Sequence, residues 1–185
     1  MKKRILLAPV VAIACMLTLV LGGCGGASAE DLIRENLESY MGEVDVADEA
    51  FVEGLESSAG EDLDQLGITA DEFAAAYLDG FGYEIGDITV DGDTATAELT
   101  ITVKSYTDIM TTFQNDFYDW AYSVDPNTLS SQDDVYKQAG QMLLEATNSA
   151  EPTSTTVEVN YTKNSDGDWE MDSSSEMELS SVVLA

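Results

Sequence analysis

Apart from carboxylates, this sequence offers few side chains that could do chemistry. Its 185 residues include no His, two Cys and 36 Asp or Glu. The absence of His removes the commonest general base and zinc ligand and excludes a Ser-His-Asp triad. The glycine-rich phosphate and dinucleotide motifs and the Gly-x-Ser-x-Gly motif are also missing. Two carboxylates could still act as acid and base, but so acidic a chain contains close pairs by chance. We therefore expect no enzyme and no catalytic residues.

One stretch approaches the spacing of a calcium-binding EF-hand loop. Counted from Asp87, it has Asp91 at the fifth position, Gly92 at the sixth and Glu98 at the twelfth. The ninth position is Ala95, however, and the flanking residues alternate with period two instead of forming helices. A hairpin with an Asp-Gly turn explains the pattern, so we expect no metal site and no cofactor.

The beginning of the chain has the pattern of an export signal. A basic start at residues 2–4 precedes an apolar run from Ile5 to Leu21, and small residues and Cys24 follow. A permanent transmembrane helix needs about 20 apolar residues, so this run is marginal for one. Two alternatives to the interpretation given next are that this run is an uncleaved membrane anchor or an ordinary secretory signal without lipidation at Cys24.

The stretch Leu21-Gly22-Gly23-Cys24 resembles the lipobox of bacterial lipoproteins. The resemblance implies that Cys24 carries lipid and that residues 1–23, with Cys15 among them, are a cleaved signal peptide. The protein would lie on the extracytoplasmic face of the cell membrane, held by acyl chains worth about 0.8 kcal/mol per buried methylene. Residues 24–29 would then be the lipidated Cys and a short tether, and residues 30–185 a single ectodomain.

The excess of acidic over basic residues limits the classes of molecule that this chain could bind. The formal net charge is −29, and loss of the signal would remove three of the seven basic residues and leave Arg34, Lys104, Lys137 and Lys163. Such a chain repels nucleic acid, so we expect no nucleic-acid partner. The charges are spread along the chain, which favours a solvated surface. Weak cation binding and docking to a cationic partner are the functional alternatives.

Helical patterns dominate the region after Cys24. Ser28 with Asp31, and Thr69 with Glu72, have the spacing of capping boxes, and apolar residues follow each pair at helical intervals. We expect one helix to end at Gly42 and another to follow Thr69. Two weaker expectations complete the region: a helix over residues 46–55 and a loop over residues 60–67.

Strict alternation then predicts a β-hairpin. Ile88 and Val90 lead into Asp91-Gly92-Asp93, and apolar residues alternate with mostly Thr from Thr94 to Lys104. One face of this hairpin is expected to be buried. The Thr-rich face, with Lys104 at its end, is expected to be wet or to line a cavity.

In the remaining sequence, stretches with helical spacing of apolar residues alternate with stretches that have the two-residue spacing of strands. They predict helices that begin near Ser105 and Ser131, a strand over 157–162, a turn at 166–168, a strand from Trp169 and one last strand over 177–184. The whole pattern predicts an α+β fold, with N-terminal helices followed by a curved antiparallel sheet of four to five strands and inserted amphipathic helices.

Two segments carry a further resemblance: the hairpin from Ile88 to Ala95 and the stretch Asp166-Gly167-Asp168-Trp169. They are similar to the nuclear transport factor 2-like superfamily, particularly to uncharacterised lipoprotein domains of Gram-positive bacteria. A cystatin-like sheet wrapped around a helix gives much the same pattern. Superfamily enzymes often use an Asp-His pair, from which this chain departs. The resemblance implies a pocket on the concave face of the sheet.

The aromatic residues from Tyr106 to Trp120 lie at helical spacing and are expected to be core. The superfamily resemblance implies instead that part of this stripe faces the concave sheet. A pocket there would be lined by Tyr106, Phe113, Phe117 and the hairpin.

These observations together predict a membrane-anchored extracytoplasmic lipoprotein that binds something at the cell envelope without catalysis. Its expected site residue is the lipidated Cys24, and its partner is the membrane together with an unknown envelope protein or small ligand. A pocket protein for a small molecule or cation is the alternative, and an enzyme with paired carboxylates is a weaker one.

Overall fold

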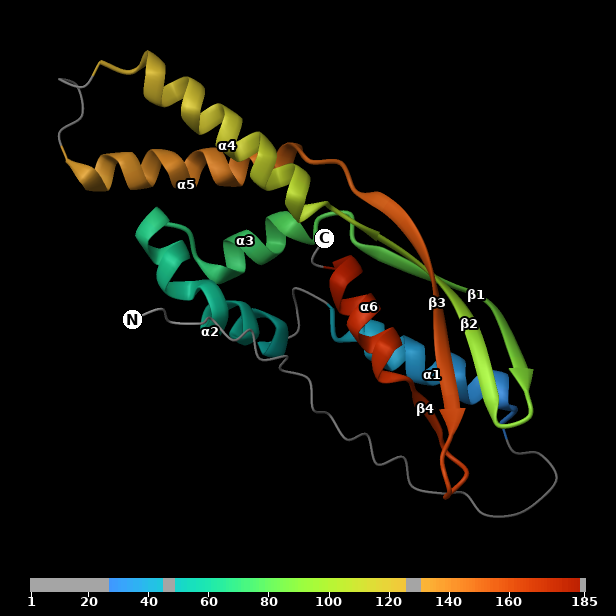
Figure 1. The fold of residues 1–185 in the computed structure, drawn as a ribbon. Coiled ribbons are helices and arrows are strands. Elements are labelled where there is room, and N and C mark those ends of the chain that lie inside the picture. The colour runs from blue at the N-terminus through green and yellow to red at the C-terminus, as the bar shows by residue number, and fades with distance from the viewer. Residues whose placement is uncertain (1–26, 45–48, 126–130, 184–185) are drawn as a thin grey trace, which may run out of the picture.

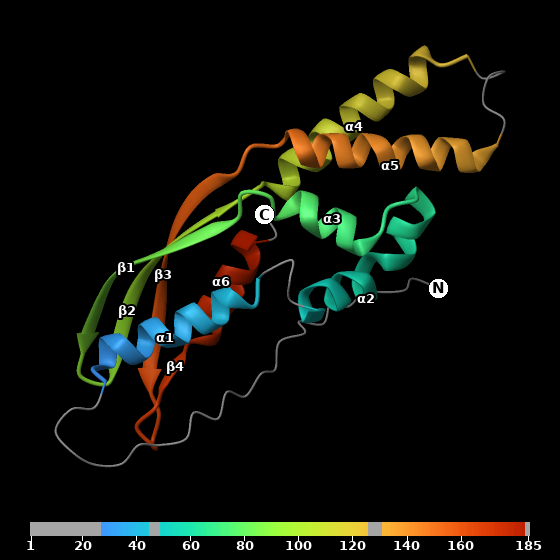
Figure 2. The ribbon, with the colours of Figure 1, turned by 180° about the vertical axis from the view of Figure 1, so that it is seen from behind.

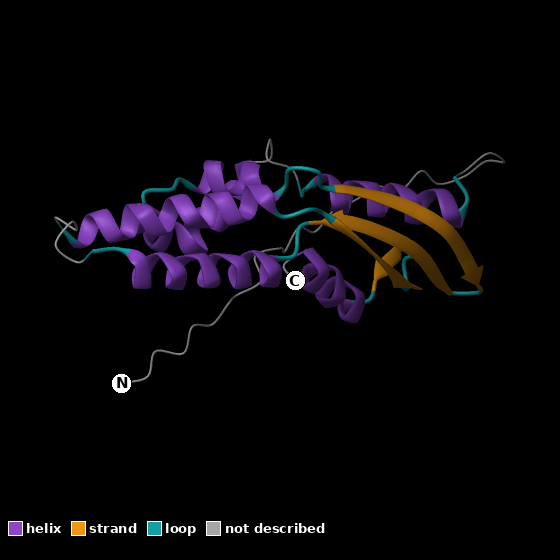
Figure 3. Ribbon diagram, turned by 90° about the horizontal axis from the view of Figure 1, so that it is seen from above, coloured by secondary structure: helices purple, strands orange, loops and turns teal. Residues whose placement is uncertain are grey.

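Two halves lie end to end in the computed structural model, which describes residues 27–44, 49–125 and 131–183. One half is an antiparallel sheet that curves around two helices, and the other consists of helices alone (Figure 1). The view from above shows the sheet and the helical half on opposite sides of their junction (Figure 3). The predicted α+β class is therefore confirmed.

The sheet has the strand order β1-β2-β3-β4, and every neighbouring pair is antiparallel. Its strands are β1 (Gly82–Asp91), β2 (Thr94–Val103), β3 (Thr153–Lys163) and β4 (Trp169–Met171). Gly92 and Asp93 connect β1 to β2, and only Gly92 has a positive φ, of 64°. That combination is typical of a type II′ turn, so the predicted hairpin is confirmed. The described residues form four strands, the lower of the two numbers expected.

A β-bulge in β1 sets which side chains face the core. Ile85 pairs with Leu99 and Ile88 pairs with Ala97, so β1 contains one extra residue between these pairs. The extra residue moves Ile88 onto the same face as Ile85, although three positions separate them. The Arg34 guanidinium donates to the carbonyl oxygens of Ile85 and Gly86, at 3.1 and 3.2 Å. Arg34 thereby binds the bulge carbonyls to the first helix.

The two faces of the sheet differ in chemistry. The concave face is apolar and carries the buried residues Ala95, Ala97, Leu99, Ile101, Val103, Val157, Val159 and Tyr161. The convex face carries cross-strand hydroxyl pairs, such as Thr100 with Thr156 at 2.9 Å and Thr102 with Ser154 at 2.8 Å. Between these pairs and Thr96 with Asn160, Glu98 lies directly opposite Glu158. The Thr-rich face is therefore on the outside.

Helices α1 (Ala29–Gly42) and α6 (Ser173–Val183) fill the concave side of the sheet (Figure 2). Ser28 and Asp31 form the predicted capping box of α1, which buries Ile33, Leu37 and Met41. The Ser28 hydroxyl and backbone N–H donate to the Asp31 carboxylate and lower its pKa. Across the core, the Tyr161 hydroxyl donates to Asn36 at 2.9 Å.

The end of the described chain is a helix, so the strand predicted over 177–184 is wrong. Ser175, Leu179 and Val183 are the buried residues of α6, and their spacing of four is helical. The buried Ser175 hydroxyl accepts from the Asn160 N–H of β3 at 2.9 Å. Because a small polar residue occupies one of the three inward positions, the apolar periodicity of this helix is weak in the sequence.

The helical half begins with α2 (Glu49–Leu66) and α3 (Ala70–Tyr77). Helix α2 continues through Gly60, so the loop predicted over 60–67 is wrong. The helix ends at Gly67, which has a φ of 72°. The Ile68 N–H donates to the Leu63 carbonyl and the Gly67 N–H to the Asp64 carbonyl, which is a Schellman motif. Thr69 and Glu72 then form the predicted capping box of α3.

Two long helices complete this half: α4 (Tyr106–Ser123) and α5 (Gln132–Ser149). Helix α4 packs mainly against α5, whereas α5 also packs against α2 and α3, and both point away from the sheet (Figures 1 and 3). Gly140 of α5 lies against the last turn of α2, where any added Cβ would overlap the Leu66 carbonyl oxygen. The lack of a side chain at Gly140 therefore allows α5 to pack closely against α2.

Candidate binding surfaces

Cys24, the predicted site of lipidation, lies outside the described residues. The description begins at Ala27, immediately before the Ser28 cap of α1. No helix within the described ranges is long and apolar enough to span a bilayer. Across those ranges, no three His, Cys, Asp or Glu residues gather as a metal ion would require. The stretch from Asp87 to Glu98 lies in the β1–β2 hairpin and not in a helix–loop–helix.

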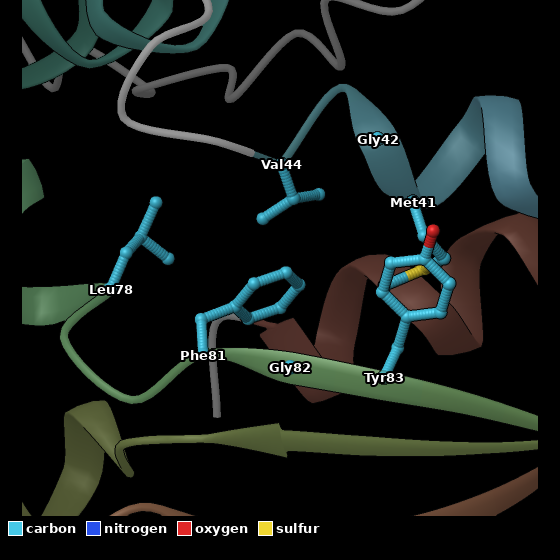
Figure 4. A pocket seen from close by; sticks show the side chains of 7 residues that line it. All are labelled: Met41, Gly42, Val44, Leu78, Phe81, Gly82 and Tyr83. Atoms are coloured by element: carbon cyan, nitrogen blue, oxygen red, sulfur yellow. The ribbon is translucent and has the colours of Figure 1, made fainter.

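An apolar groove of about 430 Å³ lies between the end of α1 and the start of β1. In Figure 4, the side chains of Val44, Leu78 and Phe81 border the same open space. The full lining consists of Met41, Gly42, Val44, Leu78, Phe81, Gly82 and Tyr83. The hydroxyl of Tyr83 is the one polar side-chain group among them. A volume of this size suits a small molecule, and a lining without charged side chains favours an uncharged one.

Among the described residues, the place of the predicted concave pocket is filled by α1 and α6. Ile33 and Leu37 of α1 and Leu179 of α6 are buried there. The residues expected to line the pocket, Phe113 and Phe117, lie on α4 in the other half (Figure 1). The sheet face that the superfamily resemblance assigns to a ligand is thus part of the hydrophobic core.

Lys104 lies at the junction of the two halves and is only 2 % exposed. Its ammonium donates to the carbonyl oxygens of Ala76 at 2.8 Å and Thr147 at 3.0 Å. These are among the last carbonyls of α3 and α5, and neither helix has a basic residue in its own last turn. One cation therefore caps the negative ends of two helices. Asp79, which is 80 % exposed, lies 3.9 Å away and contributes little.

The expectation that Lys104 lies on the wet Thr face is wrong. Strand β2 ends at Val103, so the alternation of the hairpin no longer applies at the next residue. Sequence reasoning gave Lys104 no role. The sequence feature that could have drawn attention to Lys104 is the scarcity of basic residues, because it is one of seven in an acidic chain. Its position, hydrogen bonds and burial assign it a structural role.

Helix α4 carries aromatic side chains on opposite sides. Phe113, Phe117 and Trp120 are half-buried and form a chain of ring contacts, with centroids 6.0 and 5.5 Å apart. Phe113 still packs on the core, but the contacts of Phe117 and Trp120 lie outside it. Ile109 is the one fully buried residue of the helix. The prediction that the whole stripe is core is therefore right for Ile109 and partly for Met110 and Phe113, but wrong for Tyr106, which is 43 % exposed.

The outer face of α4 consists of Asn115, Tyr118, Asp119 and Tyr122. At 3.6 residues per turn, Tyr118 and Tyr122 lie one above the other and opposite the ring chain of Phe113, Phe117 and Trp120. Tyr118 is 59 % exposed and Tyr122 is 89 % exposed. Exposed tyrosines of this kind are typical of protein interfaces. The helical spacing predicted a polar side opposite the stripe, with Asn115 and Asp119, but gave Tyr118 and Tyr122 no role.

Comparison with known proteins gives a family but no activity. A family model described as "Domain of unknown function (DUF5105)" matches residues 28–183. A search of curated proteins found no similar sequence. One similar solved structure is described as a "putative lipoprotein (ycdA)" from Bacillus subtilis subsp. subtilis str. 168, with 19 % identity and a TM-score of 0.45. The similarity covers 72 % of this chain and 45 % of that chain.

Proposed function

Because the chain belongs to the DUF5105 family, whose description assigns no activity, we propose its function from its own residues. We propose that it is a lipid-anchored extracytoplasmic protein that acts by binding another envelope protein, without catalysis. The observation that carries the binding role is α4, which projects from the core with aromatic side chains on both sides and has only α5 as its main packing partner.

The filled concave sheet supports this role over that of a pocket protein. A ligand-binding sheet of this curvature would leave space beneath its apolar face, and here α1 and α6 take that space. Aromatic area is exposed instead on a projecting helical pair. Tyr and Trp are enriched at protein interfaces, so this exposed aromatic area is consistent with a partner surface.

The anchor is supported by the sequence from Lys2 to Cys24. Replacing Cys24 with Ala should abolish lipid labelling and release the protein from the membrane fraction. The matched control is Cys15→Ala, since Cys15 lies inside the apolar run that the signal peptide would remove. We expect this control to be processed and anchored normally. A Cys24→Ala variant that is still cleaved and membrane-bound would refute the anchor.

The binding role can be tested with a photo-crosslinking amino acid placed at Tyr122 of the full chain in its own host. We expect irradiation to join this position to one protein of defined mass. The control position is Met177 of α6, which is 69 % exposed but lies in the sheet half. Equal adducts at both positions would indicate random collision and contradict a specific surface on α4.

The apolar groove supports a second candidate function, the capture of a small apolar molecule. Native mass spectrometry of the gently extracted protein would then show a co-purifying small mass. Val44→Trp should displace it, because the larger side chain would enter the space bordered by Val44, Leu78 and Phe81 (Figure 4). A bound mass that survives this substitution would exclude the groove as its site.

A further inference from the structure

We propose that the outer face of α4 docks a cationic polypeptide segment of the partner, an inference that rests on the binding role proposed above. The face presents two tyrosine rings, Tyr118 and Tyr122, with Asp119 beside them. Neither ring is needed to fill the core, because the opposite side of α4 provides the contacts to α5. The face is therefore available to a second molecule.

The charge of the helical pair selects the chemistry of that molecule. Helix α4 contains Asp108, Asp116 and Asp119 and no Lys or Arg. Helix α5 begins with Asp133 and Asp134, and its single basic residue is Lys137. Tyrosine rings attract Lys and Arg through their π faces, and nearby carboxylates strengthen the attraction. A segment rich in Lys or Arg, with apolar residues to cover the rings, complements this face.

The same charge argues against a second copy of this chain as the occupant. Two copies joined through this face would bring their Asp119 side chains together, on proteins that each carry a formal net charge of −29. Like charges that face one another across an interface cost several kcal/mol, on the order of the energy of a modest complex. Self-association through this face is therefore disfavoured.

The position of the face argues against a membrane. Helix α1 begins beside the β1–β2 turn, at one end of the molecule, and α4 ends at the other (Figures 1 and 2). A lipid on Cys24, a few residues before the Ser28 cap, would hold the β1–β2 end near the bilayer. The last turns of α4, which carry Tyr118 and Tyr122, would then lie at the end of the molecule far from the bilayer (Figures 1 and 2).

Binding of two matched peptides to the full chain tests the proposal. Both are amphipathic and about 18 residues long with identical apolar positions, but one has Lys and the other Glu at its polar positions. We expect the Lys peptide to bind and the Glu peptide not to. The double variant Tyr118→Ser/Tyr122→Ser should weaken binding about tenfold, whereas the control Met177→Ser should not change it.

Three results would overturn the proposal. If the Lys peptide binds the double variant as tightly as the wild type, its affinity comes from diffuse charge and not from this face. If the wild type forms dimers that the double variant does not, the occupant is a second copy. If the wild type floats with zwitterionic vesicles and the double variant does not, the occupant is a membrane.

The crosslink at Tyr122 separates this inference from the proposed function. A captured protein whose crosslinked segment is rich in Lys and Arg, and whose capture is lost with Tyr118→Ser, supports both. A captured protein with a neutral or acidic segment overturns the cationic partner but leaves the binding role. The absence of any specific adduct at Tyr122 contradicts both.

Discussion

The Lys104 ammonium donates to the carbonyl oxygen of Thr147 at 3.0 Å, and through it one strand end is bound to the last turn of α5. The same ammonium donates to Ala76 of α3 at 2.8 Å. The side chain that follows β2 thus connects both helices to the sheet. The two halves share this buried cation as well as apolar contacts.

Lys104→Met should therefore destabilise the protein by about 3 kcal/mol, because two buried carbonyls lose a charged donor while the aliphatic volume is kept. Urea unfolding of the variant would measure the loss. Lys137→Met is the matched control, since Lys137 is an exposed lysine of α5. Equal stability of the two variants would show that the Lys104 hydrogen bonds contribute nothing net.

Gly140→Ala should destabilise the contact between α2 and α5 by about 2 kcal/mol, because the added methyl group would overlap the Leu66 carbonyl oxygen and force the helices apart. Gly54→Ala in α2 is the opposite case. A Cβ there meets nothing within 4 Å, so we expect a gain of about 0.5–1 kcal/mol from helix propensity. Thermal unfolding of both variants measures these effects, and a stabilising Gly140→Ala would refute the close packing.

Glu158→Thr should stabilise the sheet by about 0.5 kcal/mol. Glu158 lies directly opposite Glu98 on β2, and opposed like charges weaken a strand pair. A Thr would place a hydroxyl donor opposite the Glu98 carboxylate, next to the pair formed by Thr100 with Thr156. Added salt should narrow the difference between variant and wild type because it screens the repulsion. A difference that is independent of salt would point to β-propensity instead.

Alkaline pH should unfold the protein through its buried tyrosines. Burial, with a smaller effect of Tyr106, raises the pKa of Tyr77 to about 12, and burial also raises the pKa of Tyr161. The unfolded chain ionises its tyrosines near pH 10, whereas folded Tyr77 keeps its proton. The unfolded state then binds fewer protons, so the free energy of unfolding decreases as pH increases from about 10 to about 12.

Tyr77→Phe should reduce the slope with which the free energy of unfolding decreases at alkaline pH. It should also cost about 1 kcal/mol at neutral pH, since the Tyr77 hydroxyl donates to the Val183 carbonyl at 2.7 Å. The control Tyr122→Phe should keep the slope of the wild type, because the Tyr122 ring is 89 % exposed. Unfolding in urea at a series of pH values measures both, and an unchanged slope for Tyr77→Phe would refute the prediction.

Short sequence motifs correctly predicted the elements that depend on only a few adjacent residues. The capping boxes at Ser28 and Thr69 start α1 and α3, and the Gly92 turn joins β1 to β2, because each depends on a few adjacent residues. The convex Thr face also followed from alternation alone. The α+β class is the sum of these local patterns.

The predictions that were wrong concern elements that depend on contacts between residues far apart in the sequence. Gly60 looked like a break, but packing of α2 against α3 and α5 keeps the helix intact through it. The tail looked like a strand because Ser175, a polar residue, takes an inward position of α6. The placement of α4 follows that of α5, its main packing partner, and α5 is held by the close contact of Gly140 with α2 and by the bond from Lys104. No periodicity within α4 itself encodes where the helix will point.

The bond from Tyr77 to Val183 also bears on the order in which the chain can fold. Helix α6 comes after every other described element, yet Leu179 lies in the concave core and Val183 accepts from α3. A chain emerging from the ribosome or an export channel lacks these contacts until residue 183 is free. Until then the concave face, with Val159 and Leu99, has only α1 to cover it. In a chain exported as proposed above, this late closure would leave the core incomplete until residue 183 has crossed the membrane.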